Sequence, residues 1–197
     1  MFLRLAAICL ALSAPAAVAD CVDFHSFVKG VELKLQDGSN WIARRSAHEV
    51  IRIDKTNHDG AYAQYAIGPY GVFVTEGTRN GIGTTTELAY SKTPPQPFDG
   101  MDWTSTVKNT TTSEATHSTY PAKRGKVHVT ASNLREVTLN GCTYKVMGVD
   151  IAYSADLGGM VQHFAYFPDI RFGLQTKVTY KDGSSDSAGI TGLRVVK

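Results

Sequence analysis

The chain has 197 residues, and its 20 Lys and Arg nearly balance its 18 Asp and Glu, giving a formal net charge of +2. This length fits one ordinary domain. The near-neutral balance argues against nucleic acid as a partner, because phosphate binding needs a basic surplus or stripe. The nearest basic cluster, Lys123, Arg124 and Lys126, is typical of a solvated turn.

The first 19 residues have the three parts of a secretory signal peptide. Arg4 gives a positive start, residues 5–12 are apolar, and Ala17-Val18-Ala19 supplies small residues where a signal peptidase reads. A retained anchor is the alternative, but a membrane span needs about 20 apolar residues. We therefore expect cleavage near Ala19 and a periplasmic or secreted bacterial protein, whose residues 20–197 form a single β-rich domain. Asp20 disfavours lipidation of Cys21, and no later segment reaches transmembrane length.

Of the three cysteines, Cys9 leaves with the signal, while Cys21 and Cys142 remain. Two cysteines in an exported domain usually form one disulfide, so the sequence predicts a Cys21–Cys142 bridge. A redox-active pair is the alternative, but the C-x-x-C spacing of such pairs is absent.

Turn signals recur along the whole chain. Asp-Gly or Asn-Gly pairs tolerate the positive φ of tight hairpin turns. Successive pairs are spaced by about 20 residues or by twice that length. A unit of about 20 residues holds two strands and their turns. The double intervals need further turns, which we expect near residues 120–125 and at Leu157-Gly158-Gly159. The six pairs are Asp37-Gly38, Asp59-Gly60, Asn80-Gly81, Asp99-Gly100, Asn140-Gly141 and Asp182-Gly183.

Between the turns, apolar and polar residues alternate with the period of a strand that buries one face. No apolar stripe of helical period is sustained, although short helices remain possible at Cys21–Val28 and Thr84–Tyr90. The sequence predicts an all-β antiparallel meander that forms a strongly curved sheet, half-barrel or barrel. The alternating apolar positions are Val31, Leu33 and Leu35; Val127, Val129 and Ala131; Val149, Ile151 and Tyr153; and Leu174, Thr176, Val178 and Tyr180.

Two segments depart from this alternation. Residues 94–97 contain three prolines, which cannot donate ladder hydrogen bonds, so we expect an extended connection there. Residues 104–119 hold ten Ser or Thr in 16 positions. That composition indicates an exposed edge strand or a loop.

No motif indicates a catalytic, cofactor-binding or metal-binding residue. The chain contains no G-x-S-x-G elbow, no phosphate-binding loop and no metal-ligand spacing among its histidines. His128 and His163 lie on predicted strands, where a hydrogen-bonded surface histidine is the commoner outcome. A site assembled from distant strands would escape this search, so a periplasmic hydrolase stays open as an alternative. The histidines are His25, His48, His58, His117, His128 and His163.

Aromatic residues gather on the predicted strands. Ordinary core packing is the commoner explanation, and the sharper hypothesis is that some line an apolar cleft on a curved sheet. They are Tyr62, Tyr65, Tyr70, Phe73, Tyr153, Phe164, Tyr166 and Phe167.

The C-terminal segment combines an aromatic strand from Phe164, a Pro168-Asp169 turn, the pattern Leu174-x-x-x-Val178-x-Tyr180-x-Asp182-Gly183 and a closing strand through Leu193. This resembles the end of periplasmic half-barrel proteins related to the lipoprotein carriers LolA and LolB. The resemblance implies an open curved sheet whose apolar concave face takes acyl chains or a partner, and it assigns no residue a role. The chain lacks the long N-terminal helix and helical inserts of those carriers.

The sequence thus favours a non-catalytic envelope protein that binds an apolar small molecule, a lipid or a protein partner. The alternatives are the hydrolase and an interaction module that uses the Ser/Thr-rich edge. No cofactor is expected.

Overall fold

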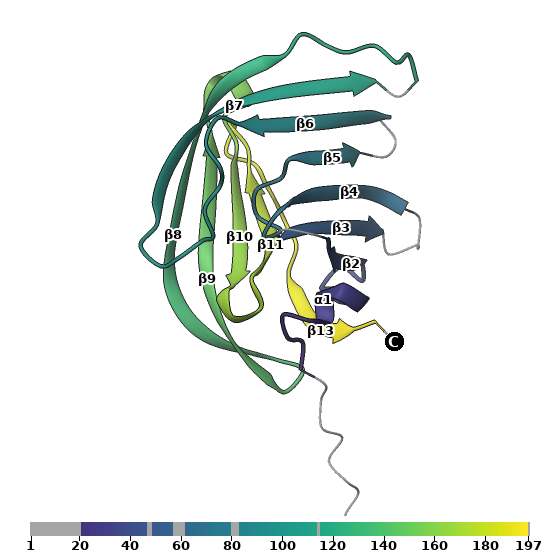
Figure 1. The fold of residues 1–197 in the computed structure, drawn as a ribbon, viewed down its shortest axis with the longest axis vertical. Coiled ribbons are helices and arrows are strands. Elements are labelled where there is room, and N and C mark those ends of the chain that lie inside the picture. Colours follow the sequence, from purple (N-terminus) through teal and green to yellow (C-terminus); the bar gives the residue numbers. More distant parts are fainter. Residues whose placement is uncertain (1–20, 47–48, 57–61, 80–82, 114, 197) are drawn as a thin grey trace, which may run out of the picture.

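The computed structural model describes residues 21–196 except 47–48, 57–61, 80–82 and 114. This part of the chain forms one sheet of 13 antiparallel strands and a single short α-helix, α1 (Ser26–Lys29). The predicted all-β antiparallel class is therefore confirmed, and the sheet curls strongly around one side (Figure 1). The strands are β1 (Val31–Leu35), β2 (Asn40–Arg45), β3 (Val50–Thr56), β4 (Tyr62–Pro69), β5 (Glu76–Arg79), β6 (Thr84–Tyr90), β7 (Asp102–Ser113), β8 (Lys123–Leu139), β9 (Cys142–Tyr153), β10 (Val161–Phe167), β11 (Phe172–Thr179), β12 (Ser185–Ser187) and β13 (Ile190–Val195).

The sheet is a meander whose spatial order follows the chain from β1 to β12, with β13 added beside β1. The two edge strands, β12 and β13, follow each other in sequence, with only Ala188 and Gly189 between them. Ala188 donates to the carbonyl of Thr176 on one end of the sheet (2.7 Å), and the carbonyl of Gly189 accepts from Gln36 at the other (2.8 Å). The chain itself therefore joins the two ends of the curled sheet.

Four of the six predicted Asp/Asn-Gly turns are confirmed. Asp37-Gly38 joins β1 to β2, Asn140-Gly141 joins β8 to β9, and Asp182-Gly183 joins β11 to β12, while Asp99-Gly100 turns the chain immediately before β7. All four glycines have positive φ. The other two pairs, Asp59-Gly60 and Asn80-Gly81, include residues outside the described part of the chain.

Of the two further turns, the one at Leu157-Gly158-Gly159 is confirmed. The one expected near residues 120–125 is wrong, because residues 123–125 already belong to β8 and the chain turns earlier, at Ala115 and Thr116. Leu157-Gly158-Gly159 follows the strand β9 in a 3-10 turn, η1 (Ala155–Leu157), and Tyr120 and Pro121 lie in the connection to β8. The Pro-rich residues 94–97 form an extended connection without regular structure, as expected.

The inward face of the sheet is filled by two apolar clusters. One lies under α1 and includes Val31, Leu33 and Phe172. The other lies under β7–β10 and includes Val129 and Ile151. The buried positions alternate along β1, β8 and β9 as the hydrophobic pattern predicts.

Two element predictions are wrong. Thr84–Tyr90 is the strand β6 and not a helix. Most of the Ser/Thr-rich segment 104–119 belongs to β7, which is an interior strand because β6 and β8 pair with it on both sides. Threonine is β-branched and suits strands, and cross-strand threonine pairs such as Thr86 with Thr111 connect β6 to β7. The interaction module is expected to use an edge strand, and β7 is not an edge over residues 102–109, where β8 pairs with it.

The N-terminal segment is fixed to the sheet at three places. Cys21 forms the predicted disulfide with Cys142 at the start of β9. The amide of Val22 donates to the Tyr144 hydroxyl (2.9 Å), and Phe27 of α1 is fully buried. A disulfide fits an oxidising compartment. None of the described helices is long and apolar enough to cross a membrane, and the expected signal peptide lies outside the described residues.

Candidate functional site

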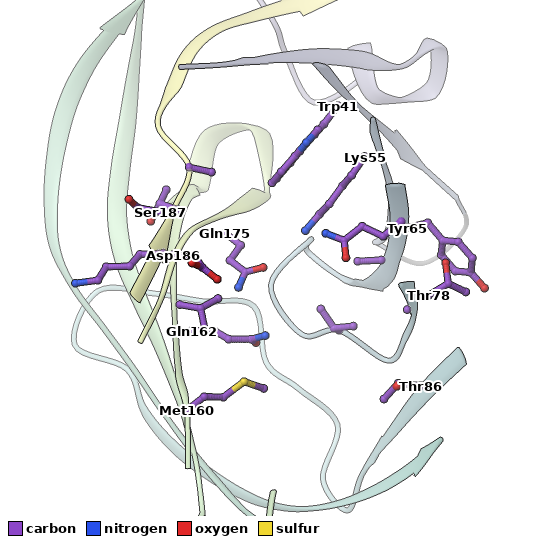
Figure 2. A pocket seen from close by; sticks show the side chains of 18 of the residues that line it. Trp41, Lys55, Tyr65, Thr78, Thr86, Met160, Gln162, Gln175, Asp186 and Ser187 are labelled. Atoms are coloured by element: carbon purple, nitrogen blue, oxygen red, sulfur yellow. The ribbon is translucent and has the colours of Figure 1, made fainter. Parts of the chain in front are cut away.

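A cavity of about 490 Å³ lies between two walls of the curled sheet (Figure 2). One wall is formed by β2–β6, and the facing wall by β10–β12 with the adjoining residues. Its lining includes Trp41, Lys55, Gln64, Ala66, Val74, Thr86, Met160, Gln162, Gln175, Val178, Tyr180, Asp186 and Ala188.

Strand pairing places three residues of the first wall, Trp41, Lys55 and Gln64, in one row across the sheet. Trp41 of β2 is in register with Lys55 of β3, and Lys55 is in register with Gln64 of β4. Directly opposite residues in a sheet project to the same face. Along β3, Ile51 and Ile53 are the preceding inward positions, and both are buried. Lys55 therefore takes the third inward position of a strand whose first two are isoleucine.

Lys55 is a buried cation. It is only 8% exposed, and its Nζ lies 4.4 Å from the centre of the Trp41 ring. Among the described residues it has no ion-pair partner and donates no hydrogen bond. Burial lowers the pKa of its ammonium group to about 8. At pH 7 the side chain is still mostly charged.

The facing wall presents amides and one carboxylate (Figure 2). The Tyr153 hydroxyl donates to Oε1 of Gln162 (3.1 Å), which leaves the NH2 group of Gln162 as the end available to a ligand. The Tyr180 hydroxyl donates to Oδ2 of Asp186 (2.8 Å). In Figure 2 the side chains of Gln162, Gln175 and Asp186 reach into the cavity opposite Lys55.

Apolar side chains complete the lining. Trp41, Val74, Met160 and Val178 contribute to the main cavity. A smaller hollow of about 20 Å³ adjoins Trp41 and Lys55, where the apolar residues Ile53, Val74, Phe164 and Leu174 surround it. The site therefore combines the buried charge of Lys55, the exposed charges of Asp186 and Lys177, neutral hydrogen-bonding groups and apolar surface.

Most of the aromatic residues identified from the sequence do not line the main cavity. Phe73, Phe164, Tyr166 and Phe167 are buried in the two apolar clusters, which agrees with ordinary core packing. Tyr65 borders the cavity, but its ring points away in Figure 2, and Arg52 lies over it at 4.2 Å.

Tyr153 is buried in one cluster and Tyr70 is partly buried against it. The side chain of Tyr62 lies outside the described residues.

The two strand histidines lie on the outer face of the sheet. His128 bonds to Asp102 (2.8 Å). His163 bonds through Nδ1 to Asp150 (2.8 Å) and through Nε2 to Oγ1 of Thr179 (3.1 Å). Neither histidine lines the cavity, so both are the hydrogen-bonded surface residues that the sequence favoured.

The other histidines that the structure describes add no site. His25 and His117 are exposed, and His48 and His58 lie outside the described residues. No group of three or more His, Cys, Asp or Glu in the described part of the chain could hold a metal ion.

Sequence reasoning missed Trp41 and Lys55. The available signal was the alternation of Ile51 and Ile53, which places Lys55 on the same buried face when it is continued by two residues. The role of Trp41 depends on register between β2 and β3, which a single sequence does not reveal.

No protein-family model and no curated protein sequence matches the chain. Among solved structures it is similar to the hypothetical lipoprotein YmcC from Escherichia coli (K12), with 11% identity over 82% of each chain and a TM-score of 0.44. A likeness at this level carries no conclusion about function. It names no carrier of the LolA or LolB type, so that resemblance remains an expectation.

Proposed function

We propose that this is an exported, non-catalytic binding protein that holds a small amphipathic molecule in the cavity between β2–β6 and β10–β12. The observation that carries the proposal is the cavity itself. Its volume of about 490 Å³ falls within the range of about 300–1,000 Å³ that is usual for small-molecule sites. The fold leaves this space open although two apolar clusters fill the rest of its interior.

The chemistry of the lining favours an amphipathic ligand over a purely apolar one. Trp41, Val74, Met160 and Val178 can cover a hydrocarbon segment, and each buried methylene contributes about 0.8 kcal/mol before ordering costs. The glutamines Gln64, Gln162 and Gln175 would be desolvated against a ligand without polar groups. A molecule with a polar end and an apolar body satisfies both kinds of surface.

Binding accounts for the structure better than hydrolysis. Asp150, His163 and Thr179 form an acid–histidine–hydroxyl series, which is the one arrangement of the described residues that favours the alternative. It lies outside the cavity, on the outer face of paired strands whose backbone N–H groups serve the sheet ladder. An oxyanion needs donors aimed at it, and the backbone N–H groups of these strands are already used by the ladder. We expect His163→Asn to leave any measured hydrolysis of p-nitrophenyl butyrate at the wild-type level.

Titration with the uncharged fluorophore Nile red tests the proposal. Wild-type protein should bind it saturably, with micromolar affinity. Ala66→Phe places a phenyl group in the cavity from the middle of β4 and should weaken binding at least tenfold. Ala122→Phe adds the same bulk at an exposed position before β8 and should change nothing. Equal binding by all three proteins, or no binding by the wild type, would refute a ligand site in this cavity.

Export is tested separately by N-terminal sequencing of protein secreted from a bacterial host. We expect Asp20 as the first residue because Ala17-Val18-Ala19 precedes it. An intact Met1 on the mature protein would contradict export by a cleaved signal.

A further inference from the structure

We propose that the ligand carries a single anionic oxygen-bearing group, a carboxylate or a phosphate diester, which forms an ion pair with Lys55 at the buried end of the cavity. This inference rests on the proposed binding function and specifies the chemistry of its ligand.

The first argument is the isolation of the Lys55 charge. Lysine is rarely buried without a partner, because taking an ammonium group out of water is costly unless an opposite charge and hydrogen bonds compensate. Lys55 is 8% exposed, and its described neighbour is the face of Trp41. A cation–π contact offsets part of the cost, but the three N–H donors of the ammonium group find no acceptor among the residues that the structure describes.

The second argument is where the ammonium group lies. Lys55 lines both the main cavity and the smaller hollow behind it, and in Figure 2 its side chain extends into the space between the two walls. A ligand that enters from the open side therefore meets Lys55 deep in the site, where the low dielectric strengthens a charge pair.

The remaining charged groups favour one negative charge over several. Lys177 also lines the cavity, but it is exposed, so solvent screens its charge. Asp186 is the one carboxylate among the described lining residues, and it faces Lys55 from β12. Asp186 is exposed and accepts a hydrogen bond from Tyr180, so solvent screens it more than Lys55. A second negative charge on the ligand would approach Asp186 and be repelled. The NH2 group of Gln162 provides a further neutral donor on that wall.

The experiment compares two fluorescent probes that differ only in charge, dansyl-labelled undecanoic acid and its methyl ester. Wild-type protein at pH 7 should bind the acid at least tenfold more tightly than the ester, as a charge-assisted hydrogen bond in a buried site allows. Lys55→Met should abolish that preference and leave the affinity for the ester within about twofold. Lys145→Met removes the same charge from the exposed face of β9 and should retain the preference.

A pH series on the same probes gives an independent test, and its first part uses the wild-type protein alone. The other titratable groups lining the cavity are Tyr65, Lys177, Tyr180 and Asp186. Loss of the Lys55 proton should weaken acid binding between pH 7 and pH 9, while ester binding stays constant, and Lys55→Met should remove this dependence. Competition by dodecanoate and by dodecyl methyl phosphate, a singly charged diester, then distinguishes the two kinds of head group.

The outcomes of these experiments distinguish failure of this inference from failure of the proposed binding function. Saturable binding of both probes with equal affinity, unchanged in Lys55→Met, would overturn the anionic ligand and leave the binding function intact. Failure of both probes to bind would refute the binding function and this inference with it. An acid preference that survives in Lys55→Met would place the anion elsewhere and also overturn the inference.

Discussion

At the scale of single residues, Lys55 links stability to pH. Its pKa is about 8 in the folded protein against 10.5 for the unperturbed group, so between these values the unfolded chain binds more protons than the folded one. Stability therefore rises as the pH rises through this window. Below pH 8 the buried charge costs the fold roughly 3 kcal/mol at most.

Replacing Lys55 should consequently stabilise the protein. We expect Lys55→Met to raise the free energy of unfolding at pH 7 by about 1–3 kcal/mol, since the charge penalty disappears while the lost contact with Trp41 offsets part of the gain. The gain should shrink toward pH 10.5. Urea denaturation at several pH values measures both effects.

Lys145→Met serves as the control for this measurement, because its side chain is exposed on β9 and its loss should change stability by less than about 0.5 kcal/mol. A Lys55→Met protein less stable than the wild type at pH 7 would show that the lysine supports the fold.

The residues that line the cavity were the hardest feature to predict from the sequence. Lys55 follows Ile51 and Ile53 at the strand period, yet lysine is normally an exposed residue, so composition favours placing it outside. The disulfide between Cys21 and Cys142 could be predicted because two cysteines in an exported domain leave one intramolecular pairing.

At the scale of elements, the turn between β8 and β9 shows how a hairpin stabilises a distant part of the sheet. Asn140 has a φ of 51°, and its side-chain amide donates to the carbonyl of Leu193 on β13 (2.9 Å). One residue therefore supplies both the left-handed conformation of the turn and a bond to the strand that completes the sheet.

We expect Asn140→Ala to lower the free energy of unfolding by about 1–2 kcal/mol, because the left-handed conformation is unfavourable for alanine and the hydrogen bond to β13 is lost. Asn140→Gly loses the hydrogen bond but adopts the left-handed conformation without strain, so we expect it to lower the free energy of unfolding by about half as much as Asn140→Ala. Chemical denaturation of both variants and the wild type measures these differences in the free energy of unfolding. Equal stability of alanine, glycine and asparagine at this position would contradict both contributions.

Turns and alternating strands could be predicted because both depend on local sequence. The strand β7 could not, since its Ser/Thr-rich sequence is compatible with an edge, and only pairing with β6 and β8 makes it interior. Thr84–Tyr90 is a strand for the same reason, because pairing with β5 and β7 outweighs weak local preference.

At the scale of the whole molecule, the disulfide and the β12–β13 junction complete the curled sheet. The bridge ties the N-terminal segment to β9 across a separation of 121 residues. We expect the Cys21→Ser/Cys142→Ser double variant to lose about 2–4 kcal/mol of stability in urea denaturation. Unchanged stability would mean that α1 and Tyr144 fix the N-terminal segment without the bridge.

Curling brings β3 opposite β11 and β12, although more than 100 residues separate them in the chain, and so creates the cavity. Curvature of the sheet could be predicted from its turns and its pattern, but the residues that face each other across the cavity depend on the degree of curling. Lys55, Gln162 and Asp186 line one cavity only in the folded sheet (Figure 2).

A crystal structure of the protein with ω-bromododecanoic acid tests most directly whether the cavity binds an anionic ligand at Lys55. The anomalous signal of bromine locates the end of the alkyl chain. We expect the carboxylate within hydrogen-bond distance of Nζ of Lys55 and the alkyl chain between the two walls. Bromine density outside the cavity, or a carboxylate directed away from Lys55, would contradict that binding mode.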